Sequence, residues 1–106
     1  MSEVNDHLFL VCYDIQNDRK RTKIADLLME YGYERLQYSV FVGLQEPSAN
    51  ERLWDRLTEL VPEENDTTDR LLVIRLLKRH FKSMQVRGHI LTDLPYICGE
   101  LSTLVI

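Results

Sequence analysis

The chain opens with a continuous hydrophobic run and then changes to a helical pattern. Residues 8–13, LFLVCY, are all apolar or aromatic, which predicts a strand buried on both faces. Apolar residues then recur at helical spacing over residues 24–31. Asn17 or Asp18 can cap this helix, and Gly32 suits a left-handed stop. The first third of the chain therefore predicts a strand followed by a helix.

The middle of the chain adds strand, helix and strand patterns. Residues 34–43 alternate and contain Tyr, Val and Phe, which favours one strand or two without deciding between them. Residues 47–61 predict a helix whose start carries a capping box formed by Ser48 and Glu51. Residues 70–76, RLLVIRL, predict another strand. This order indicates an α+β fold, a ferredoxin-like βαββαβ sandwich in which two helices cover one face of an antiparallel sheet.

The pattern after residue 76 is weaker. Residues 78–83 are typical of a turn, residues 84–88 of a short strand, and residues 91–96 of a polar break. The last run, residues 100–106, is apolar and rich in residues that favour strands. Such a run needs a pairing partner, because an exposed terminal strand promotes aggregation. We expect one or more extra strands at the C-terminal end.

Composition indicates a single small domain. The 106 residues are 44% hydrophobic and 28% charged, which is ordinary for a globular protein, and a domain of this size gains burial by pairing with a second copy. Cys12 and Cys98 are too far apart in the sequence to suggest a disulfide framework or a paired metal motif. Residues 1–7 are polar and acidic rather than typical of a signal peptide, and no apolar run approaches membrane-spanning length. We expect a cytoplasmic protein without membrane contact.

Charge is segregated along the chain. The net charge of −4 argues mildly against nucleic acid as a partner, yet residues 46–69 hold eight acids and two arginines, whereas residues 70–89 hold six Lys or Arg and no acid. Residues 19–23, RKRTK, add four cations. Charge runs are usually solvated faces, but segregation also lets one face meet phosphates. The candidate nucleic-acid-binding residues are Arg19, Lys20, Arg21, Lys23, Lys78 and Arg79.

Asp14 is the leading candidate for chemistry, since it stands at the end of the first strand and just before a helix. The pattern alone favours a simpler role, a carboxylate that starts a turn or caps a helix. However, Mg²⁺ often takes only one or two protein carboxylates and completes its shell with water and phosphate. A two-fold axis close to Asp14 would supply the second carboxylate.

Other candidate groups are weaker. Ser39 has no histidine at a spacing typical of a catalytic pair, and the histidines form no metal-binding motif. The strand aromatics could form a platform for stacking bases, although strand aromatics are more often core residues. These aromatics are Phe9, Tyr13, Tyr38 and Phe41.

Three segments together resemble the small CRISPR-associated Cas-two family: LVCYDIQNDRKRTKIADLLMEYG, RLQYSVFVGLQEPS and RLLVIRL. The resemblance implies a ferredoxin-like fold and a symmetric homodimer in which two strand-end aspartates face each other. Asp14 would then be a catalytic residue and the ligand of Mg²⁺, with Mn²⁺ as a substitute. Arg21, Arg35 and Phe41 match positions that support nuclease activity or nucleic-acid contact. Lys23 stands where some members have an arginine, which leaves a bidentate phosphate contact there in doubt.

The resemblance implies two roles that can coexist. One is CRISPR adaptation, or spacer acquisition, in which the protein bridges copies of the Cas-one integrase and binds protospacer DNA. The other is Mg²⁺-dependent endonuclease activity on RNA, including single-stranded RNA, or on DNA. The thin catalytic apparatus favours the first, and whether the protein is an enzyme stays open. Outside the family, the alternative is a toxin-like mRNA interferase, an endoribonuclease.

The resemblance also divides the chain. Residues 1–88 form the expected ferredoxin-like domain, and residues 89–106 form a tail beyond it. We expect this tail to pack on the dimer partner or on the integrase, with Leu101, Leu104 and Ile106 as apolar anchors, and packing on its own domain is nearly as plausible.

Overall fold

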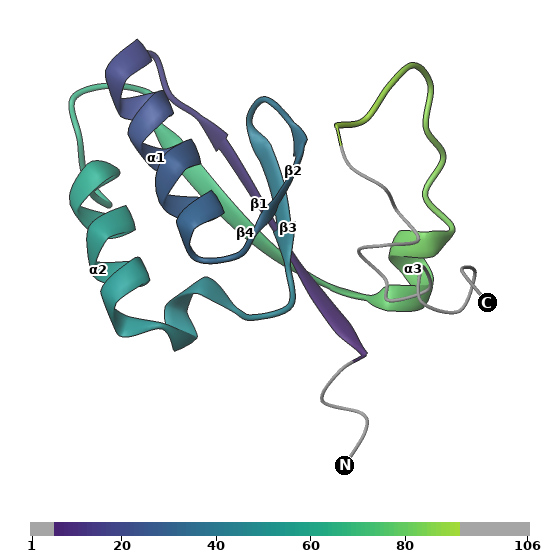
Figure 1. The fold of residues 1–106 in the computed structure, drawn as a ribbon. Helices are drawn as coiled ribbons and strands as arrows, with labels where there is room; N and C mark the ends of the chain where they lie inside the picture. The colour runs from purple at the N-terminus through teal and green to yellow at the C-terminus, as the bar shows by residue number, and fades with distance from the viewer. Residues whose placement is uncertain (1–5, 92–106) are drawn as a thin grey trace.

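The computed structural model describes residues 6–91 as a four-stranded antiparallel sheet with two helices on one face (Figure 1). The sheet order is β2-β3-β1-β4, which confirms the predicted ferredoxin-like α+β arrangement. The elements in chain order are β1 (His7–Asp14), α1 (Asp18–Glu30), β2 (Glu34–Gln37), β3 (Val40–Gly43), the 3₁₀ turn η2 (Pro47–Ala49), α2 (Glu51–Leu60), β4 (Arg70–Leu77) and α3 (Lys78–Lys82).

The central strand β1 pairs with β3 on one side and with β4 on the other. Cys12 thus lies opposite Val40 on β3 and opposite Leu72 on β4. Residues 34–43 form two strands rather than one, because Tyr38 and Ser39 make a two-residue turn between them. The hairpin turn therefore lies beside the end of β1 that carries Asp14.

Helix α1 begins and ends as its sequence predicts. The side chain of Asn17 accepts a hydrogen bond from the Lys20 backbone N–H at 2.9 Å, which satisfies one of the free donors at the helix start. Gly32 follows the helix with φ of 91°, a conformation that favours glycine.

Helix α2 begins at Glu51, four residues after the predicted start at residue 47. Asn50, not Ser48, caps it, since the Asn50 side chain accepts from the Leu53 N–H at 3.2 Å. The Ser48 hydroxyl instead donates to the Glu46 carboxylate at 3.2 Å. Pro47 fixes the backbone of a separate 3₁₀ turn, so the predicted capping box with Ser48 and Glu51 is wrong.

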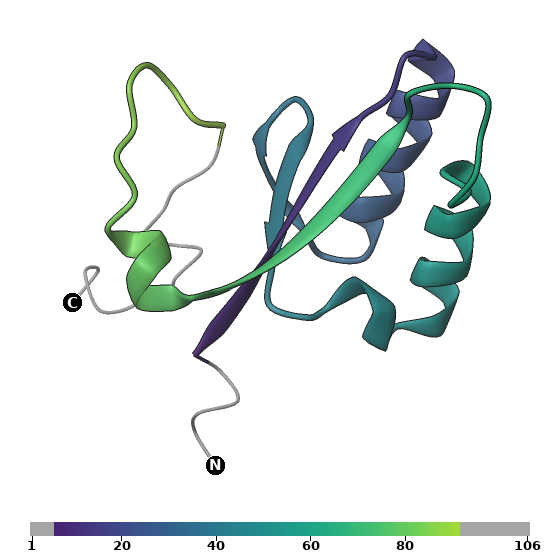
Figure 2. The same cartoon turned by 180° about the vertical axis from the view of Figure 1, so that it is seen from behind.

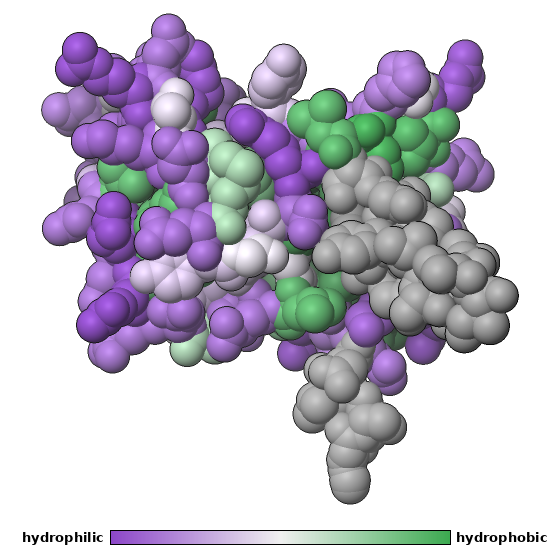
Figure 3. Space-filling view, in the orientation of Figure 1, coloured by the Kyte–Doolittle hydropathy of each residue, from purple (hydrophilic) through white to green (hydrophobic). Residues whose placement is uncertain are grey.

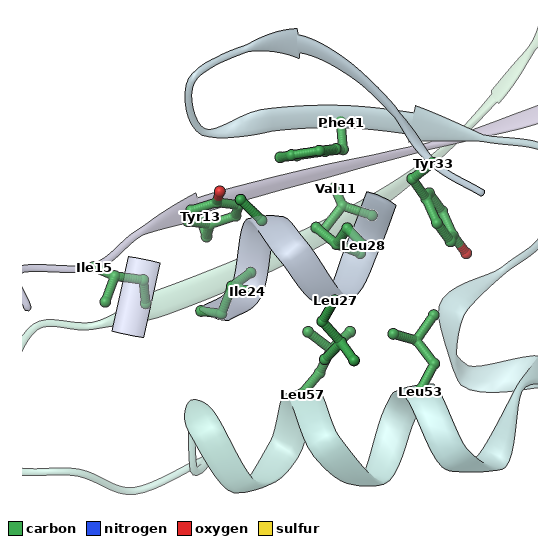
Figure 4. Packing of buried hydrophobic residues seen from close by; sticks show 11 residues of the cluster. Val11, Tyr13, Ile15, Ile24, Leu27, Leu28, Tyr33, Phe41, Leu53 and Leu57 are labelled. Atoms are coloured by element: carbon green, nitrogen blue, oxygen red, sulfur yellow. The ribbon is translucent and has the colours of Figure 1, made fainter. Parts of the chain in front are cut away.

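The main core lies between the sheet and the two long helices. Figure 4 shows Leu27 and Leu28 of α1 meeting side chains of the sheet above and Leu53 and Leu57 of α2 below. All four leucines are buried, whereas the outer surface over α1 and α2 is mainly hydrophilic (Figure 3). This division is the amphipathic pattern expected of helices that cover one face of a sheet.

A smaller core lies on the opposite face of the sheet, under α3 (Figure 2). Phe81 of this helix is 1% exposed and packs with Leu8, Leu36 and Val42. Residues 78–83 were predicted as a turn, and that prediction is wrong, because burial of Phe81 stabilises a short helix without any side-chain cap.

Beyond α3 the chain has no regular secondary structure as far as residue 91, so the predicted strand over residues 84–88 is wrong. The chain instead returns to the free edge of β2. There the Leu91 N–H donates to the Leu36 carbonyl at 2.8 Å and Gln37 Nε2 donates to the His89 carbonyl at 3.0 Å. Contacts with the domain thus continue past residue 88.

The remaining C-terminal predictions, including extra strands and the apolar anchors of the tail, lie outside the described residues. In residues 6–91, no helix has the length and apolar character needed to cross a membrane.

The strand β1 is not buried on both faces as predicted. Val11 and Tyr13 face the helices and are buried, but Leu10 and Cys12 on the other face are only partly covered. Next to them on β4, Leu72 is 55% exposed and Ile74 is 41% exposed. Helix α3 covers only one end of this face, so a stripe of apolar side chains lies open on the sheet.

Candidate functional site

Asp14 ends the stripe of apolar side chains on the open sheet face. Side chains alternate along a strand, so Asp14 shares a face with Leu10 and Cys12, away from α1 and α2. Its partner in the register of β4 is Arg70, and both residues are exposed. The open face therefore runs from an apolar middle to a charged end.

The carboxylate of Asp14 has no hydrogen bond or ion pair with any residue in 6–91. Nor do these residues contain a group of three or more His, Cys, Asp or Glu side chains that could hold a metal ion. A single accessible carboxylate suits one position in the oxygen-rich shell of Mg²⁺. Within residues 6–91, one chain thus offers the single carboxylate of Asp14 as a ligand at this end of the open face.

The turn after Asp14 is held by two charged side chains. Arg21 Nη1 donates to the carbonyls of Ile15 at 2.7 Å and Gln16 at 3.1 Å, and Arg21 also pairs with Asp18. From the other side, Asp69 Oδ1 accepts from the Gln16 N–H at 3.1 Å. Arg21 therefore braces the backbone that follows Asp14.

Arg35 braces the hairpin turn beside Asp14 in a similar way. Its Nη2 donates to the Tyr38 carbonyl at 2.8 Å, and its Nε donates to the same oxygen at 3.3 Å. The Tyr13 hydroxyl also donates to that carbonyl, at 3.2 Å. Because the Tyr13 N–H donates to the Ser39 carbonyl at 3.1 Å, both turn residues are tied to the residue that precedes Asp14.

Phe41 lies beneath Arg35 and is fully buried. Its ring stacks on Tyr13 with centroids 6.2 Å apart, and the Arg35 guanidinium carbon is 5.3 Å from its centroid. Burial raises the pKa of the Tyr13 hydroxyl, and Arg35 offsets only part of that rise. Phe41 and Tyr13 therefore support Arg35 from the core, and neither offers a proton-transfer group at neutral pH.

A pocket of about 450 Å³ opens on the helix side of this hairpin. It brings the predicted residues Arg21 and Arg35 together, whereas Asp14 lies on the opposite face of the sheet. The predicted catalytic set is thus divided by β1, with Asp14 alone on the open face. The pocket is lined by Tyr13, Asp18, Arg21, Thr22, Arg35, Tyr38 and Ser39.

The predicted nucleic-acid-binding cations fall into two groups. Arg19 and Lys23 are exposed on α1, while Lys20 lies 3.8 Å from the buried carboxylate of Asp69. Lys78 and Arg79 begin α3, at the other end of the sheet from Asp14. The eight residues of β1 separate the two groups by roughly 23 Å.

Two residues of this region were not predicted. The side chain of Asp69 is 4% exposed, yet the sequence shows it only as one of eight acids in a polar segment. Tyr38 was considered only as a strand aromatic and is in fact 79% exposed in the turn. The one sequence signal for it is its position between two short alternating segments, where a turn has to interrupt the strand.

Comparison with known proteins places these features in a family. The family of CRISPR associated protein Cas2 matches residues 7–84. A CRISPR-associated endoribonuclease Cas2 of Chloroflexus aurantiacus is 42% identical over 52 residues, which cover 49% of this chain and 61% of the relative. The chain spans only 61% to 64% of the length of the first three curated relatives that it matches.

Two solved structures share the fold. A crystal structure of Cas2 has a TM-score of 0.61 at 26% identity and covers 82% of this chain and 93% of its own. A chain of a partial Cas6-RT-Cas1–Cas2 complex has a TM-score of 0.58 at 28% identity, and the match covers 82% of this chain and 98% of that chain. Because the family match extends over residues 7–84, well over half of the sequence, this chain belongs to the Cas2 family.

Proposed function

We propose that this protein acts in CRISPR adaptation as a symmetric homodimer that binds protospacer DNA and bridges copies of the Cas1 integrase. We further propose that Asp14 from each copy supports Mg²⁺-dependent cleavage of RNA or DNA. The observation that carries both proposals is the position of Asp14 at the charged end of an apolar sheet face that α3 covers only at the other end.

The open sheet face supports the homodimer. Leu72 and Ile74 expose large apolar side chains beside the half-covered Leu10 and Cys12, and such a face gains free energy when a second copy covers it. A two-fold interface uses the same surface on both copies. An axis close to the charged end of this face would bring the two Asp14 carboxylates together.

Asp14 is the residue that would hold the metal ion. When bound, Mg²⁺ supplies charge neutralisation for the phosphate and a more acidic water for attack. The chain itself contributes the carboxylate of Asp14 and a fixed backbone behind it, because Arg21 and Asp69 hold the peptide groups of residues 15 and 16. Mn²⁺ has the same preference for oxygen ligands.

The exposed cations support binding of DNA. Arg19 and Lys23 lie on one end of the domain and Arg79 on the other, so a duplex lying along the domain could meet both groups. Each phosphate that they neutralise releases counterions and makes the affinity depend on salt. RNA presents the same phosphates, and the name of the endoribonuclease relative implies that it cleaves RNA.

The Cas1 partnership is supported by the solved complex in which Cas1 and Cas2 occur together. Residues 92–106 lie outside the described part of the chain. We propose that this tail docks Cas1 by strand addition. Deletion of residues 94–106 should then leave a folded dimer that binds DNA but does not co-purify with Cas1.

Asp14→Asn tests the two activities separately. We expect this variant to lose Mg²⁺-dependent cleavage of single-stranded RNA and duplex DNA while it keeps DNA binding and spacer acquisition. Asp55→Asn, at an exposed acid on α2, is the control and should keep every activity. Full cleavage by Asp14→Asn, or cleavage in excess chelator, would contradict the metal site, and loss of DNA binding in Asp14→Asn would contradict the separation of roles.

The dimer is tested by a pair of matched leucines. Leu72 on the open face and Leu44 just after β3 are both well exposed, at 55% and 65%. Light scattering should give a dimer mass for the wild type and for Leu44→Arg, and a monomer mass for Leu72→Arg. A monomeric wild type, or a dimeric Leu72→Arg, would exclude the open face as the interface.

A further inference from the structure

Tyr38 exposes more of its surface than any other large hydrophobic side chain in residues 6–91, at 79%. It occupies the two-residue turn between β2 and β3, beside the end of β1. An exposed aromatic ring at this place adds nothing to the core. Its position next to the candidate site raises the question of what the ring contacts.

The turn holds Tyr38 in a fixed position. Its carbonyl accepts hydrogen bonds from both Arg35 and the Tyr13 hydroxyl. In addition, the Arg35 guanidinium carbon lies 5.4 Å from the centroid of the Tyr38 ring, a cation–π distance. Arg35 therefore orients both the backbone and the ring, while most of the ring surface stays open to solvent.

The pocket behind the ring is lined by an aromatic ring, hydroxyl groups and charged side chains, among them the Arg21–Asp18 pair. Its volume of about 450 Å³ falls in the range of small-molecule sites. Arg21 and Arg35 line it as cations, and Thr22 and Ser39 add hydroxyl groups. Proteins bind single strands by combining a cationic groove for the backbone with aromatic rings on which bases stack, and every base has a face that can stack.

We propose that Tyr38 is a stacking residue for an unpaired nucleobase, held by Arg35 for that purpose. This inference rests on the proposed nucleic-acid binding and specifies the feature recognised there, a base that is free of its complement. The unpaired base occurs in two sources, a single-stranded end of duplex DNA and single-stranded RNA.

The test compares probes that differ only in their bases. Fluorescence anisotropy would measure the affinity for a blunt DNA duplex, for the same duplex with single-stranded ends, and for that duplex with abasic sites in its ends. Single-stranded RNA is the fourth probe. Comparing its affinity with that of the duplex with single-stranded ends distinguishes the two sources of an unpaired base, RNA and DNA ends. The abasic probe keeps the phosphates and removes the stacking surface.

We expect the wild type to bind base-bearing ends roughly 5- to 100-fold more tightly than abasic ends, which is the range for stacking one base. Tyr38→Ala should remove this preference, whereas Tyr38→Trp should keep it. Leu44→Ala, which removes another exposed apolar side chain, is the control and should also keep it. Thermal unfolding would establish that each variant is folded.

Two results would overturn the inference. One is equal binding of base-bearing and abasic ends by the wild type, which would remove the stacking site and leave the proposed DNA binding intact. The other is an unchanged preference in Tyr38→Ala. If the wild type bound none of the four probes, the proposed function itself would fail, and this inference with it.

Discussion

Arg35 and Tyr38 are joined twice across the β2–β3 turn, once through the backbone and once through the ring. Arg35 Nη2 lies 2.8 Å from the Tyr38 carbonyl oxygen, and its guanidinium carbon lies 5.4 Å from the centroid of the Tyr38 ring. A planar guanidinium can make both contacts at once, whereas a lysine ammonium is a point charge. Arg35 is therefore a positioning residue for the turn beside Asp14.

Arg35→Lys should separate the two contacts. We expect Arg35→Ala to lower the free energy of unfolding by about 1 kcal/mol, because the Tyr13 hydroxyl still satisfies the Tyr38 carbonyl. Arg35→Lys should recover only part of this loss. Urea unfolding measures both values, with Arg52→Ala on the exposed side of α2 as a control. Full recovery by lysine would argue against the double contact.

Asp69 should contribute more to stability than the other acids of its segment. Its carboxylate accepts from the Gln16 N–H and lies near Lys20, so Asp69→Ala leaves both groups without their partner. We expect a loss of about 1 to 3 kcal/mol, and a smaller loss in Asp69→Asn, which keeps an acceptor. Asp66→Ala, at an exposed site, should be nearly neutral by the same unfolding measurement. Equal losses of stability in Asp69→Ala and Asp66→Ala would refute the proposed contribution of Asp69.

Gly43 leaves space for the ring of Tyr33. A Cβ atom added at Gly43 would lie 2.4 Å from Tyr33 Cδ2, so we expect Gly43→Ala to destabilise the fold by about 1 to 3 kcal/mol through overpacking. In a Tyr33→Leu background the same substitution should cost less. A double-mutant cycle measures the difference, and additive effects would show that the close approach is not the cause.

The pH dependence of stability should include a contribution from Tyr33 at alkaline pH. Burial, with a smaller effect of Glu46, raises the pKa of Tyr33 to about 12, while the ordinary value is near 10. The unfolded chain therefore loses this proton first. The stabilisation is complete below pH of about 10 and is lost as pH rises through about 12.

Between pH of about 10 and about 12, we expect the free energy of unfolding to fall less in Tyr33→Phe than in the wild type. The difference between the two losses should reach about 2 to 3 kcal/mol at most. Chemical unfolding across this range gives both slopes. Identical slopes in the two proteins would show that Tyr33 does not titrate in this way.

The sequence predicted the elements whose local signals agree with their packing. The spacing of apolar residues in 24–31, the Asn17 cap and Gly32 all describe α1 correctly. The prediction was wrong at the start of α2, where two residues compete for the position of the helix cap. Ser48 and Asn50 can each cap a helix, and the 3₁₀ turn imposed by Pro47 places Asn50 at the start.

Other features depend on contacts between distant residues. Helix α3 forms because Phe81 packs against Leu8 and Val42, and no side-chain cap marks its start. The division of the site follows from the alternation of β1, which places Asp14 and Tyr13 on opposite faces. The burial of Asp69 has no sequence signal, because it requires the β1–α1 turn to lie beside residue 69.

The shared metal site is the central claim, and the stoichiometry of Mn²⁺ binding tests it most directly. We expect titration of the wild-type dimer, followed by electron paramagnetic resonance of the free ion, to show one bound ion for every two chains, because a two-fold axis joins two Asp14 carboxylates in one site. The Asp14→Asn dimer should bind none. One ion for each chain, or binding that persists in Asp14→Asn, would contradict a metal site shared between two copies.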